Sequence, residues 1–547
     1  MTKFHRFLSL ILAILTVFST LAFVACQKDD NKGDNPGGDE TPTPDVIPPL
    51  ADTTDDNYRT FYQIFVGSFS DSNGDTFGDL RGIINRMDYL NDGDLNNGND
   101  LGVQGIWLSP IFASPTYHKY DAKDYYQIDW RFGNMDDLKE LADLCEERNV
   151  KLILDLVLNH TSIQNDWFAE FKKSRLADDT SNKYYDYYTC VTRAERVSGR
   201  TYQKLGNLDA YYEINFSGDM PELNFDNPAV RQEMLDIAKY YIDLGIDGFR
   251  FDAVKYIYYG DTKACIEFWN WFMSELKAYK PDIYCVGECW SAESEILQYY
   301  EAMNCFNFGM SGAEGQAARA AKGISLSSFV NYIEMFQDKV QAANPAGMPM
   351  PFLANHDQDR IAGTFILESN LKMSANLYLL SPGSPFIYYG EEIGIKGSRG
   401  SAMTDANRRL AMLWGDGDEV KDPIGTTYSP DYQTNGTVAE QLAKENSILL
   451  HYAKLINVRT RYPAIARGNY NAVTSTNKNF AGFYVEYEGE ILGIIHNNSD
   501  SEISIPLTDL KGMDEHSFST LCEVLGTSAS LENGVLTIAA CTSVILK

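Results

Sequence analysis

From Tyr58 onward, short apolar runs alternate with helix-like patterns, and this alternation constrains the fold more than any other feature. Strands that alternate with helices are typical of a parallel sheet covered by helices. We predict eight strands, over residues 60–69, 105–112, 151–158, 248–254, 284–289, 305–308, 350–355 and 385–389.

The helices between these strands carry their own start and stop signals. Asn227 can cap a helix, and Pro228 fits the first helical position. Gly245 stands where the left-handed residue after a helix is favoured. Asn134 likewise precedes an apolar stripe before the strand at 151–158. The helix that begins at Pro228 has an apolar stripe with helical spacing, which consists of Val230, Met234, Ile237 and Tyr241.

Two segments depart from the alternation of strands and helices and indicate further domains. More than 60 residues rich in Tyr, Asp and Ser follow the third strand, which is too long for a simple loop. We therefore predict an inserted subdomain at 161–222, with the main domain at 57–160 and 223–468. After the helix at 446–461, alternating short strands predict an antiparallel β domain at 469–547. Its strands are expected at 480–487, 490–496, 503–507 and 535–540.

The first 26 residues read as an export signal, in which basic residues precede an apolar run over 7–24. Ala25-Cys26 resembles the end of a bacterial lipobox, where Cys26 would be lipidated and become the new N-terminus. Phe23 departs from the usual Leu, so an uncleaved transmembrane anchor is the alternative. Both interpretations place the protein on the extracellular face of a bacterial membrane. Residues 27–56 are predicted to form a disordered acidic tether.

The composition excludes one large class of partner. The net charge of −30 argues against nucleic acid, whose phosphates require Lys and Arg. It is compatible with a neutral substrate and bound cations, and we expect a monomer. Eight cysteines besides Cys26 show no metal-ligand spacing. We interpret them as small buried residues, with one or two disulfides as the alternative.

Four predicted strands carry carboxylates toward their C-terminal ends: Asp155, Asp252, Glu288 and Asp357. Arg250 shares a strand face with Asp252 and would keep it ionised. In a closed barrel that face points inward, where charge is costly unless it has a function. Each residue alone could be structural, as an ion pair or a strand-end Glu. Together they indicate a barrel active site, and two carboxyls in different environments suit glycoside hydrolysis.

These segments, in their order and spacing, resemble the conserved regions of glycoside hydrolase family 13, the α-amylase family. The resemblance covers about residues 58–547. It implies an α/β fold: a (β/α)8 TIM barrel, an inserted subdomain after strand 3 and a C-terminal antiparallel β-sandwich. The segmentation above agrees with this layout independently.

The resemblance also implies roles for single residues. Asp252 would be the nucleophile, Glu288 the acid/base, and Asp357 the third carboxylate, which holds sugar hydroxyls. Arg250 would fix the charge of the nucleophile. The remaining residues expected to bind substrate are Tyr120, Asp155, His160, Lys255 and His356.

A separate signal lies in the loop at 71–79, where oxygen-bearing side chains alternate around a glycine. This spacing is how a loop wraps Ca²⁺, although the bidentate Glu of an EF-hand is lacking. Family members with a similar loop bind calcium there, and Thr76 stands where they usually have Gly. A metal-free acidic turn is the alternative. The expected ligands are Asp71, Asn73, Asp75, the Phe77 carbonyl and Asp79.

Local cues favour endo-hydrolysis of α-1,4 bonds in starch. Ala253 and Lys255 match amylases that act on α-1,4 bonds, although Tyr256 replaces a common His. The motif at 220–224 resembles a subgroup between oligo-1,6-glucosidases and neopullulanases. Neopullulanase- or cyclomaltodextrinase-like activity, exo-acting α-glucosidase activity and transglycosylation therefore stay open. A non-catalytic starch-binding surface lipoprotein is the alternative of another class, but it would be expected to lose one of the three carboxylates.

Overall fold

Seven parallel strands form the largest sheet, in the order β11-β10-β9-β5-β2-β1-β12, in the computed structural model of residues 57–94, 97–513 and 516–547. Parallel bridges join Phe306 to Met350 and Phe352 to Phe386. The segment around Met350 therefore lies between β11 and β12, supplies the one remaining strand and closes a (β/α)8 barrel. The seven strands are β1 (Phe61–Ile64), β2 (Gly105–Leu108), β5 (Lys151–Leu156), β9 (Gly248–Phe251), β10 (Tyr284–Gly287), β11 (Asn304–Cys305) and β12 (Phe386–Tyr388).

Each barrel strand lies at a predicted position, but most are shorter than predicted. The run at 60–69 pairs only as far as Ile64, and the run at 248–254 only as far as Phe251. The apolar sequence continues after the last ladder pair into buried loops. These loops carry Asp252, Glu288 and Asp357, whereas Asp155 and Arg250 lie within strands β5 and β9.

The predicted helix signals are confirmed. The Asn227 side chain accepts a hydrogen bond from the Ala229 amide at the start of α6 (Pro228–Asp243), and Gly245 has a φ of 102°. Asn134 forms a capping box with Asp137 in α4 (Met135–Glu147). The other helices of the catalytic region are α2 (Leu80–Asn85), α3 (Met87–Leu90), α7 (Thr262–Tyr279), α8 (Glu293–Tyr299), α9 (Gln316–Ala321), α10 (Leu326–Ala343), α11 (Glu368–Leu379), α12 (Val438–Leu442), α13 (Ile448–Arg461) and α14 (Ala464–Arg467).

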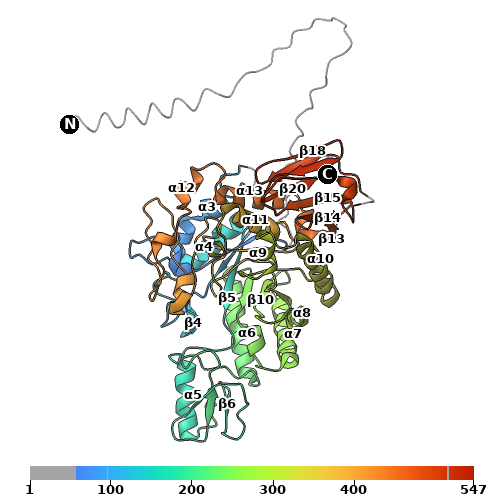
Figure 1. Ribbon diagram of the computed structural model, residues 1–547. Coiled ribbons are helices and arrows are strands. Elements are labelled where there is room, and N and C mark those ends of the chain that lie inside the picture. The colour runs from blue at the N-terminus through green and yellow to red at the C-terminus, as the bar shows by residue number, and fades with distance from the viewer. Residues whose placement is uncertain (1–56, 95–96, 514–515) are drawn as a thin grey trace, which may run out of the picture. The chain divides into compact units, whose positions relative to one another are not determined.

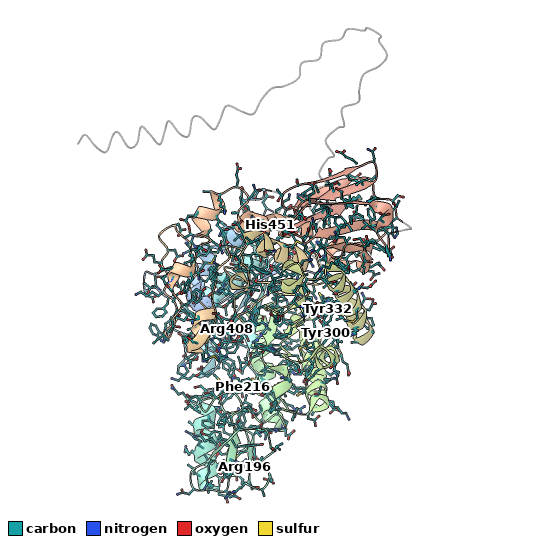
Figure 2. All side chains as sticks on the ribbon, viewed as in Figure 1. Arg196, Phe216, Tyr300, Tyr332, Arg408 and His451 are labelled. Carbon is teal, nitrogen blue, oxygen red and sulfur yellow. The ribbon has the colours of Figure 1, made fainter. Side chains whose placement is uncertain are left out.

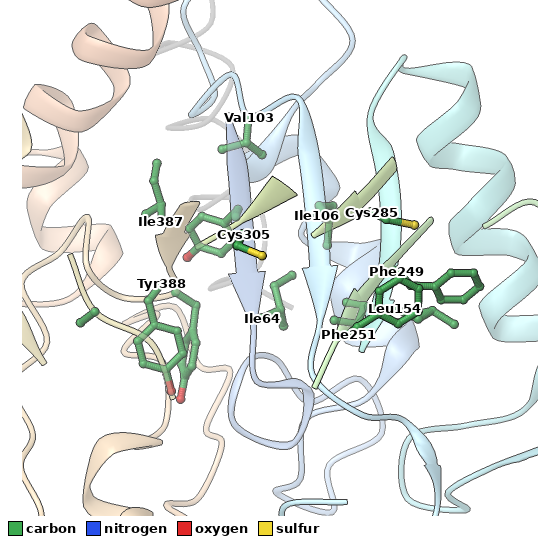
Figure 3. Packing of buried hydrophobic residues seen from close by; sticks show 14 of the residues in the cluster. Ile64, Val103, Ile106, Leu154, Phe249, Phe251, Cys285, Cys305, Ile387 and Tyr388 are labelled. Atoms are coloured by element: carbon green, nitrogen blue, oxygen red, sulfur yellow. The ribbon is translucent and has the colours of Figure 1, made fainter. Parts of the chain in front are cut away.

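Side chains of the strands alternate between the barrel interior and the surrounding helices. Ile64, Ile106 and Phe249 belong to the large core between sheet and helices (Figure 3). Their neighbours on the opposite face fill the barrel, including Phe61, Trp107, Ile153, Tyr284 and Val286. Arg250 and Asp155 occupy inward positions of the same alternation, which places two charges inside the barrel.

Between β5 and α6 the chain forms α5 (Asp166–Ala177) and a three-stranded antiparallel sheet. Figure 1 shows this segment below the barrel strands. The strands of this three-stranded sheet are β6 (Cys190–Val191), β7 (Tyr202–Lys204) and β8 (Tyr211–Glu213). The boundaries of the inserted subdomain at 161 and 222 stay predictions. A separate two-stranded sheet, β3 (Phe112–Ala113) and β4 (Asp124–Ile128), follows β2.

Two antiparallel sheets form the C-terminal region, drawn in red in Figure 1. They pack through an apolar cluster that includes Phe480, Ile495 and Val544. The larger sheet contains β13 (Asn469–Thr474), β14 (Phe480–Tyr487), β15 (Glu490–Asn497), β17 (Leu521–Leu525) and β20 (Thr542–Leu546). The smaller one contains β16 (Ile503–Pro506), β18 (Ala529–Glu532) and β19 (Val535–Ile538).

Across the described residues, no helix combines the length and apolar character needed to cross a bilayer. The eight cysteines of this part of the chain are free, and six of them are buried, which agrees with the interpretation as small core residues. The predicted signal, the lipidation site Cys26 and the tether at 27–56 lie outside the described residues.

Candidate active site

Four predicted site residues lie in the segments that follow barrel strands, and they share one pocket. His160 follows β5, Asp252 follows β9, Glu288 follows β10, and Asp357 follows the strand at Met350. All four line a cavity of about 710 Å³. The C-terminal ends of the strands therefore build the pocket, as this barrel favours.

The Arg250 guanidinium joins three carboxylates beneath the pocket. It is fully buried, and its Nη1 lies 2.8 Å from both Asp155 Oδ1 and Asp252 Oδ1. Its Nη2 lies 3.0 Å from Glu288 Oε2. Asp252 and Glu288 thus contact the same planar group, which brings the two predicted reacting carboxyls together.

One guanidinium cannot neutralise three buried carboxylates, so protonation within this group is favoured, and burial raises the pKa of Asp155 as well as that of Glu288. Burial raises the pKa of Glu288 to about 8, and the negative charges of Asp252 and Asp357 add to this effect against the opposing charge of Arg250. Glu288 Oε2 also accepts a hydrogen bond from the Ala253 amide at 3.0 Å. The protonated carboxyl faces the pocket and can act as an acid near neutral pH.

Asp357 has the opposite environment. Burial alone would raise its pKa, but His356 and the guanidinium groups of Arg409 and Arg250 lower the pKa well below its usual range. Arg409 Nη2 lies 2.7 Å from Asp357 Oδ1, and Arg409 Nη1 donates to Tyr117 Oη at 3.1 Å. The pocket therefore moves the pKa values of Glu288 and Asp357 in opposite directions, which favours a proton on Glu288 and a negative charge on Asp357.

Tyr120 and His356 form a stacked pair, with ring centroids 5.2 Å apart and planes 7° from parallel. The Gln63 amide donates to His356 Nδ1 at 2.8 Å, which places the imidazole proton on Nε2. That nitrogen lies 3.0 Å from Asp357 Oδ2 and 2.6 Å from Tyr120 Oη. The Tyr120 hydroxyl in turn donates to Asp155 Oδ2 at 2.8 Å. Burial lowers the pKa of His356 and keeps the ring neutral.

His160 and Lys255 lie at other parts of the pocket wall. His160 is buried, and its Nε2 makes no hydrogen bond to a described residue, so it is available to a sugar hydroxyl. Lys255 Nζ donates to the Trp290 carbonyl at 2.7 Å. All the predicted catalytic and sugar-binding residues therefore line the pocket or lie beneath it. Those that are buried beneath it are Asp155, Arg250 and His356.

Several pocket residues were not predicted from the sequence. Arg409, Phe216 and Trp290 line the pocket, and Gln63 orients His356 from below. A polar residue within the apolar strand β1 was a usable signal for Gln63, and Trp290 stands two residues after Glu288. Arg409 lies in an irregular segment and Phe216 in the inserted one, where no pattern marks them.

The loop at 71–79 folds around its own acidic side chains. Asp71 Oδ1 accepts hydrogen bonds from the Asn73 and Gly74 amides, both at 2.9 Å, and Asp75 Oδ1 accepts one from the Phe77 amide at 2.9 Å. Asp79 accepts from the Gly82 amide and caps α2.

No cluster of three or more His, Cys, Asp or Glu suited to a metal is found in the described part of the chain. The predicted set also includes Asn73 and a backbone carbonyl, and oxygen donors of this kind fit Ca²⁺. Thr76 has a φ of 74°, the conformation in which the usual Gly would be unstrained. Calcium binding here stays a prediction.

Comparison with known proteins gives the family. Residues 63–468 match the α-amylase catalytic domain. Alpha-amylase 3 of Dictyoglomus thermophilum is 37% identical over 446 residues, which cover 80% of this chain and 84% of that protein. An oligo-1,6-glucosidase of Bacillus cereus is 30% identical over 553 residues, with 86% and 95% covered. The structure of Eubacterium rectale Amy13B matches with a TM-score of 0.83 at 32% identity and covers 91% of this chain and 96% of its own. The chain therefore belongs to the α-amylase family, glycoside hydrolase family 13.

Proposed function

We propose that this family 13 enzyme is an endo-acting α-amylase that hydrolyses α-1,4 bonds of starch with retention of configuration. The observation that carries the proposal is the pair Asp252 and Glu288, which share one guanidinium and line one pocket, with burial raising the pKa of Glu288. Retaining glycosidases need one carboxylate as nucleophile and one carboxylic acid as proton donor, close to the same bond.

In the first step, Asp252 attacks the anomeric carbon while the bond to the glycosidic oxygen breaks. Glu288 gives its proton to that oxygen, and the shortened glucan leaves. In the second step, the Glu288 carboxylate takes a proton from water, whose oxygen attacks the anomeric carbon and releases Asp252. Two inversions restore the original configuration. Asp357 and His160 would hold hydroxyls of the reacting sugar, and the Tyr120 ring would stack on it.

Specificity within the family is the part that relatives leave open, because both an α-amylase and an oligo-1,6-glucosidase are similar to this chain. The alternatives are neopullulanase- or cyclomaltodextrinase-like action and exo-acting α-glucosidase action. A substrate panel decides between them: soluble starch, pullulan, cyclodextrin and a maltoheptaoside blocked at its non-reducing end. Cleavage of the blocked substrate supports endo action, whereas faster cleavage of pullulan than of starch would favour the first alternative. No release of reducing sugar from any α-glucan would favour a non-catalytic binding protein.

Two further parts of the proposal lie outside the pocket. We infer that the loop at 71–79 binds Ca²⁺, supported by its set of oxygen ligands. We also infer that Cys26 is lipidated and that the enzyme faces outward from a bacterial membrane, supported by the sequence of the first 26 residues. Protease treatment of intact cells tests the location: the enzyme should be lost from the surface, and its survival would contradict this part.

A further inference from the structure

Trp130 is 77% exposed, more than any other aromatic side chain in the described residues. It follows β4, in the connection between β2 and α4. A single exposed apolar residue is common on protein surfaces, but Trp is enriched at interaction sites, and neighbouring exposed groups strengthen that interpretation. Its ring takes no part in the pocket described above.

The chain holds Trp130 outward by anchoring both sides of its turn. Asp129 is buried and pairs with buried Lys119 at 2.6 Å. Phe132 is also buried, and its amide donates to the Asp129 carbonyl at 2.8 Å. The Phe132 carbonyl accepts from the Leu80 amide at 3.0 Å. Trp130 and Arg131 are therefore presented at the tip of a fixed turn.

A second aromatic ring and a cation complete the surface. The Arg131 guanidinium carbon lies 5.2 Å from the centroid of the Trp130 ring and 5.6 Å from that of Phe77, which is 43% exposed. Within the described residues, the Arg131 side chain makes no hydrogen bond or ion pair. Two exposed rings thus flank a set of available hydrogen-bond donors.

This surface lies on the same side of the barrel as the pocket. Phe77 belongs to the connection from β1 to α2, and Trp130 to the connection from β2 to α4; both follow the C-terminal ends of barrel strands. Lys119, which pairs with Asp129, adjoins Tyr120 in the pocket wall. The surface and the pocket therefore lie at the same end of the barrel.

We propose that Trp130, Arg131 and Phe77 form a second binding site for α-glucan chains, outside the catalytic pocket. The proposal rests on the proposed function and adds a site that holds the polymer while the pocket cuts it. The apolar C–H faces of glucosyl rings stack on the aromatic rings, and Arg131 donates hydrogen bonds to hydroxyl oxygens. The neighbouring acidic loop at 71–79 and the net charge of −30 disfavour an anionic lipid surface.

The test measures retention in amylopectin gels and adsorption to starch granules, in the Asp252→Asn background so that the polymer is not cut. Trp130→Ala should weaken retention by about tenfold, the usual effect of losing one stacked aromatic ring. Trp130→Phe should recover most of it, and Arg131→Gln should have a smaller effect than Trp130→Ala. Tyr279→Ala is the matched control, because Tyr279 is 45% exposed at the end of α7, on the opposite face of the barrel.

Trp130→Ala in the active enzyme should change kcat/KM for maltoheptaose by less than about twofold, since the pocket is untouched; this activity also shows that the variant folds. Unchanged retention of Trp130→Ala would overturn the proposal. A change in the sedimentation coefficient of this variant relative to the wild type would also overturn it, because this face would then be a contact between copies of the chain. The two proposals fail separately. Retention that depends on Trp130 without any hydrolysis would disprove only the proposed function, and hydrolysis with retention independent of Trp130 would disprove only the second site.

Discussion

Asp252 faces the pocket and accepts a hydrogen bond from Arg250, so Asp252→Asn removes its charge with little change in shape. We expect kcat on soluble starch to fall by about 10⁴-fold or more, because an amide cannot form the glycosyl ester. Glucan binding should persist. Reducing-sugar release and retention in amylopectin gels measure the two effects, with exposed Asp431→Asn as the control. Near wild-type turnover would mean that another residue is the nucleophile.

The pH dependence of the enzyme follows from Glu288. Burial raises its pKa to about 8, so the proton needed for the first step is present at neutral pH and is lost as the pH rises through that value. We expect kcat/KM for maltoheptaose to fall above about pH 8. In Glu288→Gln, an activated aryl glycoside, whose leaving group needs no proton, should be cleaved without this alkaline limb. An alkaline limb near pH 5 in the wild type would contradict the raised pKa.

At the scale of strands and helices, features that depend on neighbours in the chain could be predicted. The Asn227 cap and the left-handed Gly245 need only adjacent residues, and both were found from the sequence. Contacts across the barrel could not be found in this way. Gln63 and His356 are 293 positions apart, and Arg409 and Asp357 are 52 apart. The fold brings them together, and neither pair has a local pattern.

Strands of the C-terminal region show the same limit. β14 was predicted over its observed span, because polar turns bound it on both sides. β13, β17, β18 and β20 were missed: β17 is half-exposed and irregular in register, and β20 is buried along its whole length and so lacks alternation. Their assignment depends on the partner strand rather than on their own residues.

The loop between β1 and α2 is the element whose stability should depend on a metal. If Ca²⁺ binds there only in the folded protein, a chelator should lower the melting temperature by about 2 °C or more. Replacing Asp71 and Asp75 by Asn should remove this sensitivity, since both predicted ligands lose their charge. Differential scanning calorimetry with metal analysis measures both results. An unchanged melting temperature in a protein that contains no calcium would contradict the metal site.

At the scale of the whole described unit, buried polar contacts join the barrel helices to the C-terminal sheets. Asn376 on α11 is fully buried; its Nδ2 donates to the Leu525 carbonyl at 2.9 Å and to Ser543 Oγ at 3.0 Å. Its Oδ1 lies 2.8 Å from His451 Nε2. One amide therefore satisfies groups from two sheet strands and one helix, and Leu525 and Ser543 among them are fully buried.

Asn376→Ala should accordingly cost about 3 kcal/mol of unfolding free energy, because it leaves buried donors and acceptors unpaired. Urea unfolding followed by tryptophan fluorescence and circular dichroism measures this loss. Asn471→Ala is the control, since that amide donates only to Asn469 of its own strand. If the barrel and the C-terminal sheets are one cooperative unit, both probes should shift together to lower urea. An unchanged midpoint would show that the two parts are stabilised independently of this contact.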